Sequence, residues 1–303
     1  MTATRRLAIL LLTASSCQRD ALRIAPPDDD TAAPDDTAVV LPARPLYFGH
    51  PPNLSVKDSL SEHKAFAAYL GQAIGHEVAL VVPEHYDDVA ARLVAGKLDF
   101  ALLTPFLYVR AKKRLPKLQL LASLLGEGAT QYRGYVVTAA TSPMQRVADL
   151  KGKRFAFVDQ ASASGYLFPL ALLNEAGLDP KRDFKEVLFA GSHKTVVDWV
   201  LSGRVDAGAI SSTSFMHFRG DAISSRLFVL AKTDWIPFDA FVAHPSVAAG
   251  VANRVRRALL SLDSRTAEGR EILTGITTNN GFVDGNDQTY EPVRQVAEKL
   301  GVE

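Results

Sequence analysis

The sequence predicts an α/β protein built from two related lobes. Short apolar runs alternate with helical patterns along most of the 303 residues, which is typical of parallel βαβ units. Residues 86–101 also align without a gap with residues 193–208. Because the chain is 47% hydrophobic and 22% charged, it is long and apolar enough to bury two cores.

The first half of the chain supplies strands and helices in strict alternation. Apolar runs predict strands at 45–49, 77–82 and 98–103, and amphipathic patterns predict helices at 56–74, 86–95 and 105–112. Pro105 suits the first position of the last of these helices, because proline needs no N–H partner there. Two further strands are expected at 118–125 and 132–139.

A second series begins with a polar turn and a strand at 154–158. The same patterns then predict helices at 163–176 and 192–202 and strands at 184–190, 205–210 and 226–233. After "DWIPFDAFVAH" the chain turns mostly helical, near residues 247–262, 265–274 and 290–300.

The internal repeat consists of a helix, a glycine stop and a strand that opens with an aspartate. Gly96 aligns with Gly203, and Asp99 aligns with Asp206, which we interpret as structural groups bonding nearby backbone. Tyr86 and His193 would then occupy the same helix start, at the ligand-binding edge of an open α/β sheet. Chance similarity between two amphipathic helices is the alternative.

The N-terminus has the features of a secretory signal. Residues 1–17, "MTATRRLAILLLTASSC", contain two arginines, a short apolar run and small residues before Cys17. Cys17 is the single cysteine and resembles a lipobox cysteine, although Ala14 stands where that pattern prefers leucine. We expect a lipid anchor at Cys17, with an ordinary cleaved secretory peptide as the alternative. Residues 18–43, rich in Pro, Asp, Ala and Thr, are expected to form a disordered tether.

Composition and missing motifs exclude several functions. A net charge of +1 offers no footprint for nucleic acid, and no apolar run after the N-terminus is long enough for a membrane span. The chain has no Gly-x-Ser-x-Gly, His-Glu-x-x-His or P-loop motif, and its histidines lack metal-ligand spacing. We therefore expect no enzymatic activity, no cofactor and no metal.

Small residues gather at the junction between strand 154–158 and the helix that follows. Ser162, Ala163, Ser164 and Gly165 could simply cap this helix, because a serine hydroxyl satisfies a free backbone N–H group. The same N–H groups and the helix dipole could also bind an anion. The junction alone leaves both interpretations open.

Four segments together resemble a known family: "VPEHYDDVAARLVAGKLDFALLTPFLYVRA", "RGYVVTAATSPMQRVADLKGKRFAFVDQASASGYLFP", "FKEVLFAGSHKTVVDWVLSGRVDAGAIS" and "WIPFDAFVAH". The family is that of the periplasmic substrate-binding proteins of phosphate, phosphite and phosphonate ABC transporters. The resemblance implies a type II clam-shell fold, with mixed sheets flanked by helices and two chain crossings. It places lobe one at 44–135 plus 236–303 and lobe two at 136–235, with crossings near 136–139 and 233–237.

The resemblance also implies which residues of lobe two contact an oxyanion. Ser162 and Ser164 would donate hydroxyl hydrogens, and Ala163, Ser164 and Gly165 would donate backbone N–H groups. Gly165 would allow close approach of the ligand. Ala163 stands where the family has threonine most often, so one side-chain hydrogen bond is lost. His193 matches the family's anion-contacting histidine, and either ring nitrogen could donate.

Lobe one would add further ligand contacts. Tyr86 matches a phenolic donor of the family, and Thr104 could add a hydroxyl, although a Thr-Pro helix cap explains it equally well. Asp239 stands where the family can place an acid for the ammonium group of an aminophosphonate. Ser212 and Thr213 stand where the second acid is expected, which argues against 2-aminoethylphosphonate. Asp239 could instead accept a hydrogen bond from a protonated oxyanion.

These residues predict a periplasmic, lipid-anchored and monomeric solute-binding protein. Its partners would be a small oxyanion and the permease of an ABC transporter. The alternative is a ligand-sensing module of a signalling system that uses the same fold.

Overall fold

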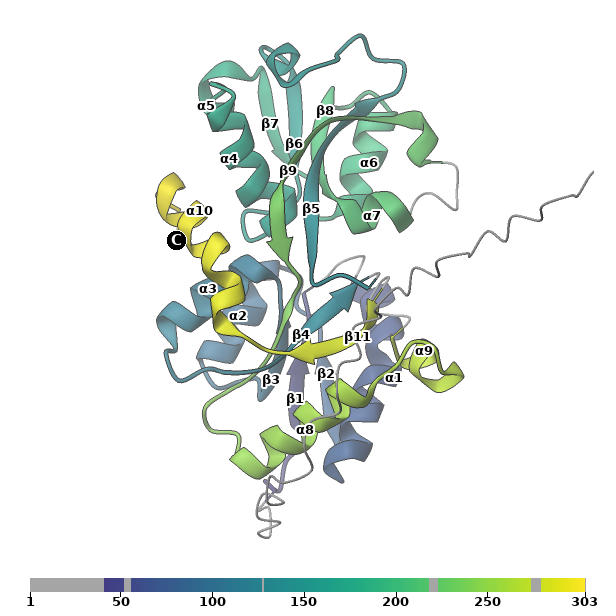
Figure 1. Cartoon of the computed structure of the whole chain (residues 1–303), viewed down its shortest axis with the longest axis vertical. Coiled ribbons are helices and arrows are strands. Elements are labelled where there is room, and N and C mark those ends of the chain that lie inside the picture. The colour runs from purple at the N-terminus through teal and green to yellow at the C-terminus, as the bar shows by residue number, and fades with distance from the viewer. Residues whose placement is uncertain (1–40, 52–55, 127, 218–222, 274–278, 303) are drawn as a thin grey trace, which may run out of the picture. The chain divides into compact units, whose positions relative to one another are not determined.

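A computed structural model of the chain describes residues 41–51, 56–126, 128–217, 223–273 and 279–302 (Figure 1). The predicted signal peptide with Cys17, and the predicted tether as far as residue 40, lie outside the described residues. Within the described ranges, no helix combines the length and the apolar character that a membrane crossing requires.

Two mixed β-sheets organise the described chain. The strands of the first sheet are β1 (Leu46–Gly49), β2 (Val78–Val81), β3 (Phe100–Leu103), β4 (Gln119–Gly126), β10 (Ala240–Ala243) and β11 (Asn279–Asp284). The strands of the second sheet are β5 (Gln131–Ala139), β6 (Arg154–Phe157), β7 (Glu186–Phe189), β8 (Ala207–Ser211) and β9 (Leu227–Pro237). The predicted α/β class with mixed sheets is confirmed.

The two sheets share the same order of strand directions, although the chain visits their strands in a different sequence. β1 pairs in parallel with β2 and β3, and β6 pairs in parallel with β7 and β8. β10 runs antiparallel to β3 and β4, as β5 does to β8 and β9. The order β2-β1-β3-β10-β4 of the first sheet therefore recurs as β7-β6-β8-β5-β9 in the second, and β11 extends the first sheet beyond β4.

Helices cover both faces of each sheet (Figure 1). Around the first sheet, α1 (Val56–Ile74), α8 (Ala249–Ser261) and α9 (Ala267–Leu273) lie on one side, and α2 (Tyr86–Val94), α3 (Pro105–Arg114) and α10 (Glu291–Leu300) lie on the other. Around the second sheet, α4 (Phe168–Glu175) and α5 (Pro180–Asp183) lie opposite α6 (His193–Leu201) and α7 (Ser212–His217). Short 3₁₀ turns occur at Val147–Leu150, Ser224–Arg226 and Asp287–Tyr290.

Alternate residues of the central strands pack into different hydrophobic cores. Phe100 and Leu102 of β3 are fully buried with residues of α1 and α8, whereas Ala101 and Leu103 are fully buried with residues of α2 and α3. Successive side chains of a strand point to opposite faces, so a strand covered by helices on both sides must be apolar throughout. This explains the uninterrupted apolar run that predicts β3.

The internal repeat corresponds to equivalent elements of the two sheets. α2 and α6 span the same part of each copy, and both are followed by a glycine in the left-handed region, Gly96 with φ 67° and Gly203 with φ 75°. Glycine adopts this conformation without the steric cost of a side chain, so it ends both helices.

Asp99 and Asp206 fasten equivalent strands, which confirms their structural interpretation. Asp99 accepts hydrogen bonds from the Tyr47 N–H group at 2.8 Å and from the Arg44 guanidinium at 2.7 and 2.9 Å. Asp206 accepts from the N–H group of Arg154 at 2.8 Å and from its guanidinium at 2.9 and 3.1 Å. Each carboxylate therefore joins the third strand of a βαβαβ segment to the first.

The chain passes between the two sheets twice. β4 ends at Gly126 in the first sheet and β5 begins at Gln131 in the second, while β9 ends at Pro237 and β10 begins at Ala240. The expected lobe boundaries, 135/136 and 235/236, fall inside β5 and β9, both of which pair within the second sheet. We propose that the lobes divide between β4 and β5 and between β9 and β10.

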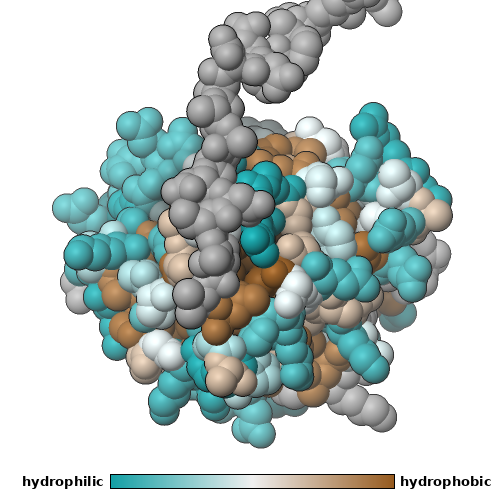
Figure 2. All heavy atoms as spheres, turned by 90° about the horizontal axis from the view of Figure 1, so that it is seen from below, coloured by the Kyte–Doolittle hydropathy of each residue, from teal (hydrophilic) through white to brown (hydrophobic). Residues whose placement is uncertain are grey.

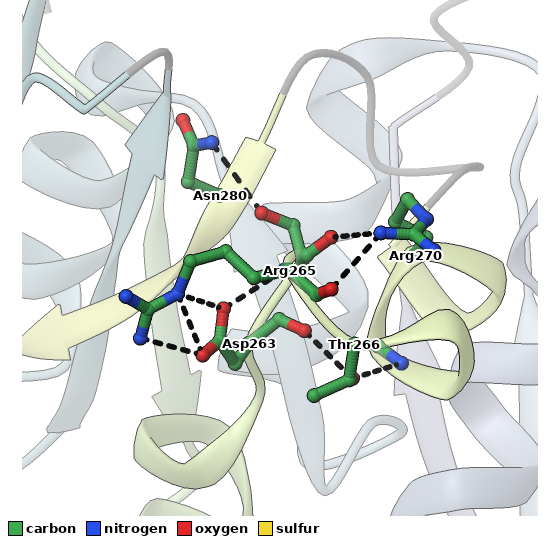
Figure 3. A network of polar contacts seen from close by, with 7 residues as sticks. Asp263, Arg265, Thr266, Arg270 and Asn280 are labelled. Atoms are coloured by element: carbon green, nitrogen blue, oxygen red, sulfur yellow. Dashed lines mark hydrogen bonds and ion pairs between the residues drawn. The ribbon is translucent and has the colours of Figure 1, made fainter.

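The connection between α8 and α9 is held by a polar network (Figure 3). Asp263 and Arg265 form an ion pair with 2.7 Å between Oδ2 and Nη2, and this guanidinium lowers the pKa of Asp263 to about 2. The Thr266 hydroxyl donates to the Asp263 carbonyl and accepts from the Gly269 N–H group, both at 2.9 Å. These bonds fix a turn, and they explain its polar residues without a ligand.

Hydrophilic side chains dominate the face drawn in Figure 2, around a smaller hydrophobic area. Among the described residues, the large hydrophobic side chains that are markedly exposed are Leu60, Phe189, Phe228 and Trp235. Trp235, 51% exposed, lies under the Arg133 guanidinium at 4.2 Å. A cation over an indole face stabilises such an exposed ring.

Candidate functional site

The strand-to-helix junction forms a π-helix, Ala163–Leu167, that continues into α4. Ser162 is its N-cap, because the Ser162 hydroxyl accepts a hydrogen bond from the Gly165 N–H group at 3.0 Å. The Ser162 carbonyl accepts from the Leu167 N–H group at 3.0 Å, which is the wider spacing of a π-turn. Single π-turns occur frequently at functional sites. The capping interpretation of Ser162 is thus confirmed without excluding an anion site.

Gly165 is used by the fold of the junction itself. Its N–H group donates to Ser162, so the structure does not leave it free for a ligand. A Cβ atom at Gly165 would lie 2.4 Å from Val158 Cγ2 and 2.9 Å from Ser162 Oγ. The glycine therefore lets the helix start pack closely against Val158. The N–H groups of Ala163 and Ser164 lie in the first turn, where no intrahelical acceptor is available.

Ser164 connects the junction to buried phenols. Its side chain lies close enough to Tyr132, at the start of β5, to lower the pKa of that phenol against the larger effect of burial, and both residues are buried. Tyr86, the first residue of α2, lies close enough to Tyr132 for its charged form to raise the pKa of the Tyr132 phenol, in addition to the larger effect of burial. The structure thus brings together Ser164 and Tyr86, two predicted residues, through a third that the sequence did not single out.

Asp239 lies among these phenols. Burial raises the pKa of its carboxyl to about 7, and the carboxylate in turn raises the pKa values of Tyr86, Tyr132 and Tyr290. The segment that carries it is fixed, because the Tyr290 hydroxyl donates to the Phe238 carbonyl at 3.0 Å. Near neutral pH this carboxyl can therefore either donate or accept a hydrogen bond.

Thr104 contacts the junction from the first sheet. It is the N-cap of α3 but makes no side-chain capping bond, and its hydroxyl instead donates to the Ala161 carbonyl at 3.3 Å. Asp159 accepts from the Ala161 N–H group at 2.8 Å, and burial is the main cause of its raised pKa. Thr104 thus occupies the N-cap position before Pro105, as the capping interpretation expects, but its side chain does not cap the helix.

His193 begins α6, at the position equivalent to Tyr86 in α2. Its Nδ1 atom accepts a hydrogen bond from the Ser211 N–H group at 3.1 Å, and burial lowers its pKa to about 4. Ser192 caps the same helix by accepting from the Thr195 N–H group at 3.1 Å. His193 is therefore not needed as a cap.

Hydroxyl groups occupy the region where the second acid was expected. The Ser211 hydroxyl lies 2.9 Å from Thr213 Oγ1 and 2.8 Å from Ser214 Oγ. Ser212 accepts from the Arg133 N–H group at 3.2 Å. These hydroxyl groups use their hydrogen bonds on one another and on the backbone. The residues at this end of β8, Ser211 to Ser214, include no carboxylate.

The donors of the site are mostly neutral hydroxyl, phenol, amide and imidazole groups. Such groups can hold an oxyanion in a water-poor site without a formal positive charge. Sequence reasoning missed Tyr132, Asp159 and Ser211. Tyr132 follows the first passage between sheets directly, and that position is the signal that could have identified it.

Comparison with known proteins agrees with this geometry. The chain is 28% identical over 254 residues, 77% of its length and 79% of the relative, to the phosphate-import protein PhnD of Mycolicibacterium smegmatis. It is 27% identical over 219 residues to the tetrathionate sensor histidine kinase TtrS of Salmonella typhimurium, covering 66% of this chain but only 37% of that protein.

A solved structure, PhnD1 of Prochlorococcus marinus in complex with methylphosphonate, has the same fold. It aligns with a TM-score of 0.78 at 21% identity and covers 84% of this chain and 98% of that one. The profile of a family described as the phosphonate periplasmic substrate-binding proteins of ABC transporters matches residues 48–290. The chain therefore belongs to this family of periplasmic solute-binding proteins, which are not enzymes.

Proposed function

We propose that the protein captures a phosphorus oxyanion, namely phosphonate, phosphite or phosphate, and delivers it to the permease of an ABC transporter. The observation that carries this proposal is the placement of Ser164 in the first turn of the π-helix, with the Thr104 hydroxyl donating to the Ala161 carbonyl beside it and with Tyr132, Tyr86 and Asp239 near enough to affect one another's pKa values. Membership in a periplasmic solute-binding family supports the same class of ligand and a periplasmic location.

The proposed ligand contacts come from both sheets. From the second sheet, we propose the Ser162 and Ser164 hydroxyls, the N–H groups of Ala163 and Ser164, and His193. From the first sheet and its connections, we propose Tyr86, Thr104 and Asp239. Gly165 supports this set through its packing on Val158 and not as a donor.

The ligand is expected to lack an amine. An ammonium group needs compensating carboxylates when it leaves water, and the hydroxyls of Ser211, Thr213 and Ser214 are bonded to one another where a second acid would stand. We expect phosphate, phosphite or methylphosphonate to bind more tightly than 2-aminoethylphosphonate.

A calorimetric panel of these four ligands tests the proposal, with sulfate as a tetrahedral dianion that carries no proton at neutral pH. Tightest binding of the amine would contradict the assigned preference. Failure of all the phosphorus oxyanions to bind would contradict the proposed function itself.

We also propose that Cys17 carries a lipid anchor and that the body works as a monomer. Metabolic labelling with a radioactive fatty acid should mark the wild-type chain and not Cys17→Ser. Equal labelling of both chains, or of neither, would contradict the anchor.

A sensing role is the second candidate. Similarity to the tetrathionate sensor kinase covers 66% of this chain, so the same fold occurs in a signalling protein. Co-purification of this protein with a permease and ATPase supports transport, whereas a membrane kinase in their place supports sensing.

A further inference from the structure

His193 makes a hydrogen bond that determines which of its ring nitrogens carries hydrogen. The Ser211 N–H group lies 3.1 Å from His193 Nδ1. A backbone N–H group can only donate, so Nδ1 must accept through its lone pair. In a neutral imidazole the hydrogen then resides on Nε2.

The surroundings of His193 also keep the ring neutral. Burial lowers its pKa to about 4, and among the described residues no charged group contributes to this shift. The hydrogen bond that the described chain makes with this imidazole is at Nδ1, which leaves the Nε2–H group available to another acceptor.

Ser211 is itself held firmly at the end of β8. It is 4% exposed, and its backbone pairs with Gly134 of β5. Its hydroxyl accepts from the Ser214 N–H group at 3.0 Å and contacts the Thr213 and Ser214 hydroxyls. The direction of the Ser211 N–H group is therefore fixed by the sheet on one side and by the start of α7 on the other.

We propose that Ser211 is a positioning residue that holds His193 as a neutral imidazole and aims its Nε2–H group at the bound oxyanion. This inference rests on the proposed function and deepens it. The anion receives a dipole and not a cation from His193, so the site has no imidazolium to compensate for a ligand's second negative charge.

Nitrogen NMR of the full protein with ¹⁵N-labelled histidine tests the tautomer, at pH 6 to 8, with and without methylphosphonate. We expect His193 to carry hydrogen on Nε2 alone in both states. A ring protonated on Nδ1 alone, or on both nitrogens after methylphosphonate binds, would overturn the proposal. The ligand-free spectrum reports the Ser211 contact even if methylphosphonate does not bind, so failure of the proposed function is distinguishable.

Two substitutions test the direction of donation. The amide nitrogen of His193→Gln can occupy the place of Nε2, whereas that of His193→Asn lies closer to the place of Nδ1. We expect methylphosphonate affinity to fall about threefold in the glutamine variant and about tenfold in the asparagine variant, the loss of one hydrogen bond to a charged group. Equal losses, or the reverse order, would contradict the geometry.

Ser211→Ala tests the positioning. Loss of the Ser211 hydroxyl bonds should populate a second His193 tautomer and weaken methylphosphonate binding about threefold, in line with a partly lost hydrogen bond. Ser202→Ala is the matched control, because the exposed Ser202 hydroxyl bonds only the Trp199 carbonyl among the described residues, at 3.3 Å. An unchanged His193 spectrum in Ser211→Ala would refute the role of the hydroxyl cluster.

Discussion

Replacing Asp239 by asparagine removes a carboxyl whose protonation should be coupled to ligand binding. Burial raises its pKa from 3.8 to about 7, so about one carboxyl in ten is still protonated in the ligand-free protein at pH 8. An oxyanion bound beside it favours the protonated form further, because two like charges cannot both stay ionised in a buried site. At pH 8 binding should therefore take up close to one proton per ligand.

Calorimetry in two buffers of different ionisation enthalpy measures this uptake. The wild type should take up about one proton with methylphosphonate at pH 8, and its affinity should fall about tenfold for each further pH unit. Asp239→Asn should take up distinctly less, since the contribution of the ligand itself is common to both proteins. Equal uptake by the two proteins would refute the role of Asp239.

The same substitution should change how stability depends on pH. A carboxyl with a raised pKa holds its proton longer in the folded than in the unfolded state, so it makes the ligand-free protein less stable as pH rises from about 4 to about 7. His193, with its lowered pKa, makes the protein less stable as pH falls from 6.5 to about 4, because its imidazole takes up a proton more readily in the unfolded state. Asp239→Asn should therefore lose less stability than wild type between pH 5 and pH 8 in denaturant melts, and an equal loss would contradict the burial of Asp239.

Two further substitutions test packing and the repeat. Gly165→Ala should destabilise the fold by about 1 to 3 kcal/mol, because its methyl group would overlap Val158. In chemical denaturation this loss of stability should be smaller when Val158→Ala is also present. An unchanged loss in that double variant would point to a different cause. Asp99→Asn should cost about 1.5 to 3 kcal/mol, the value of hydrogen bonds to a charged group, and more than the equivalent Asp206→Asn, because the Asp99 side chain is 6% exposed and that of Asp206 is 30% exposed. A larger loss at Asp206 would contradict this ranking by burial.

Much of the fold could be predicted from apolar periodicity and helix stops. The starts of α2 and α6 at Tyr86 and His193 follow from the repeat, and β3 and β8 follow from fully apolar runs. β11 was missed because "NNGFVD" is polar at its start and is held by antiparallel pairing with β4, a contact that no local pattern signals.

The candidate site was predicted less completely. Ser162 and Ser164 stand out by residue type, but the use of the Gly165 N–H group by Ser162 depends on the π-turn, which local sequence does not specify. Tyr132 is brought to Ser164 by the way the chain re-enters the second sheet, and the raised pKa of Asp239 depends on burial by distant segments. These are consequences of tertiary packing.

The affinity of Ser164→Ala and His193→Ala for methylphosphonate tests most directly the claim that an oxyanion binds at the π-helix start. Both residues lie at the proposed site, so calorimetry on the folded variants should show each about tenfold weaker than wild type. Ser202→Ala, in the exposed turn after α6, should bind as wild type does. Unchanged affinity in both Ser164→Ala and His193→Ala would contradict the assigned site.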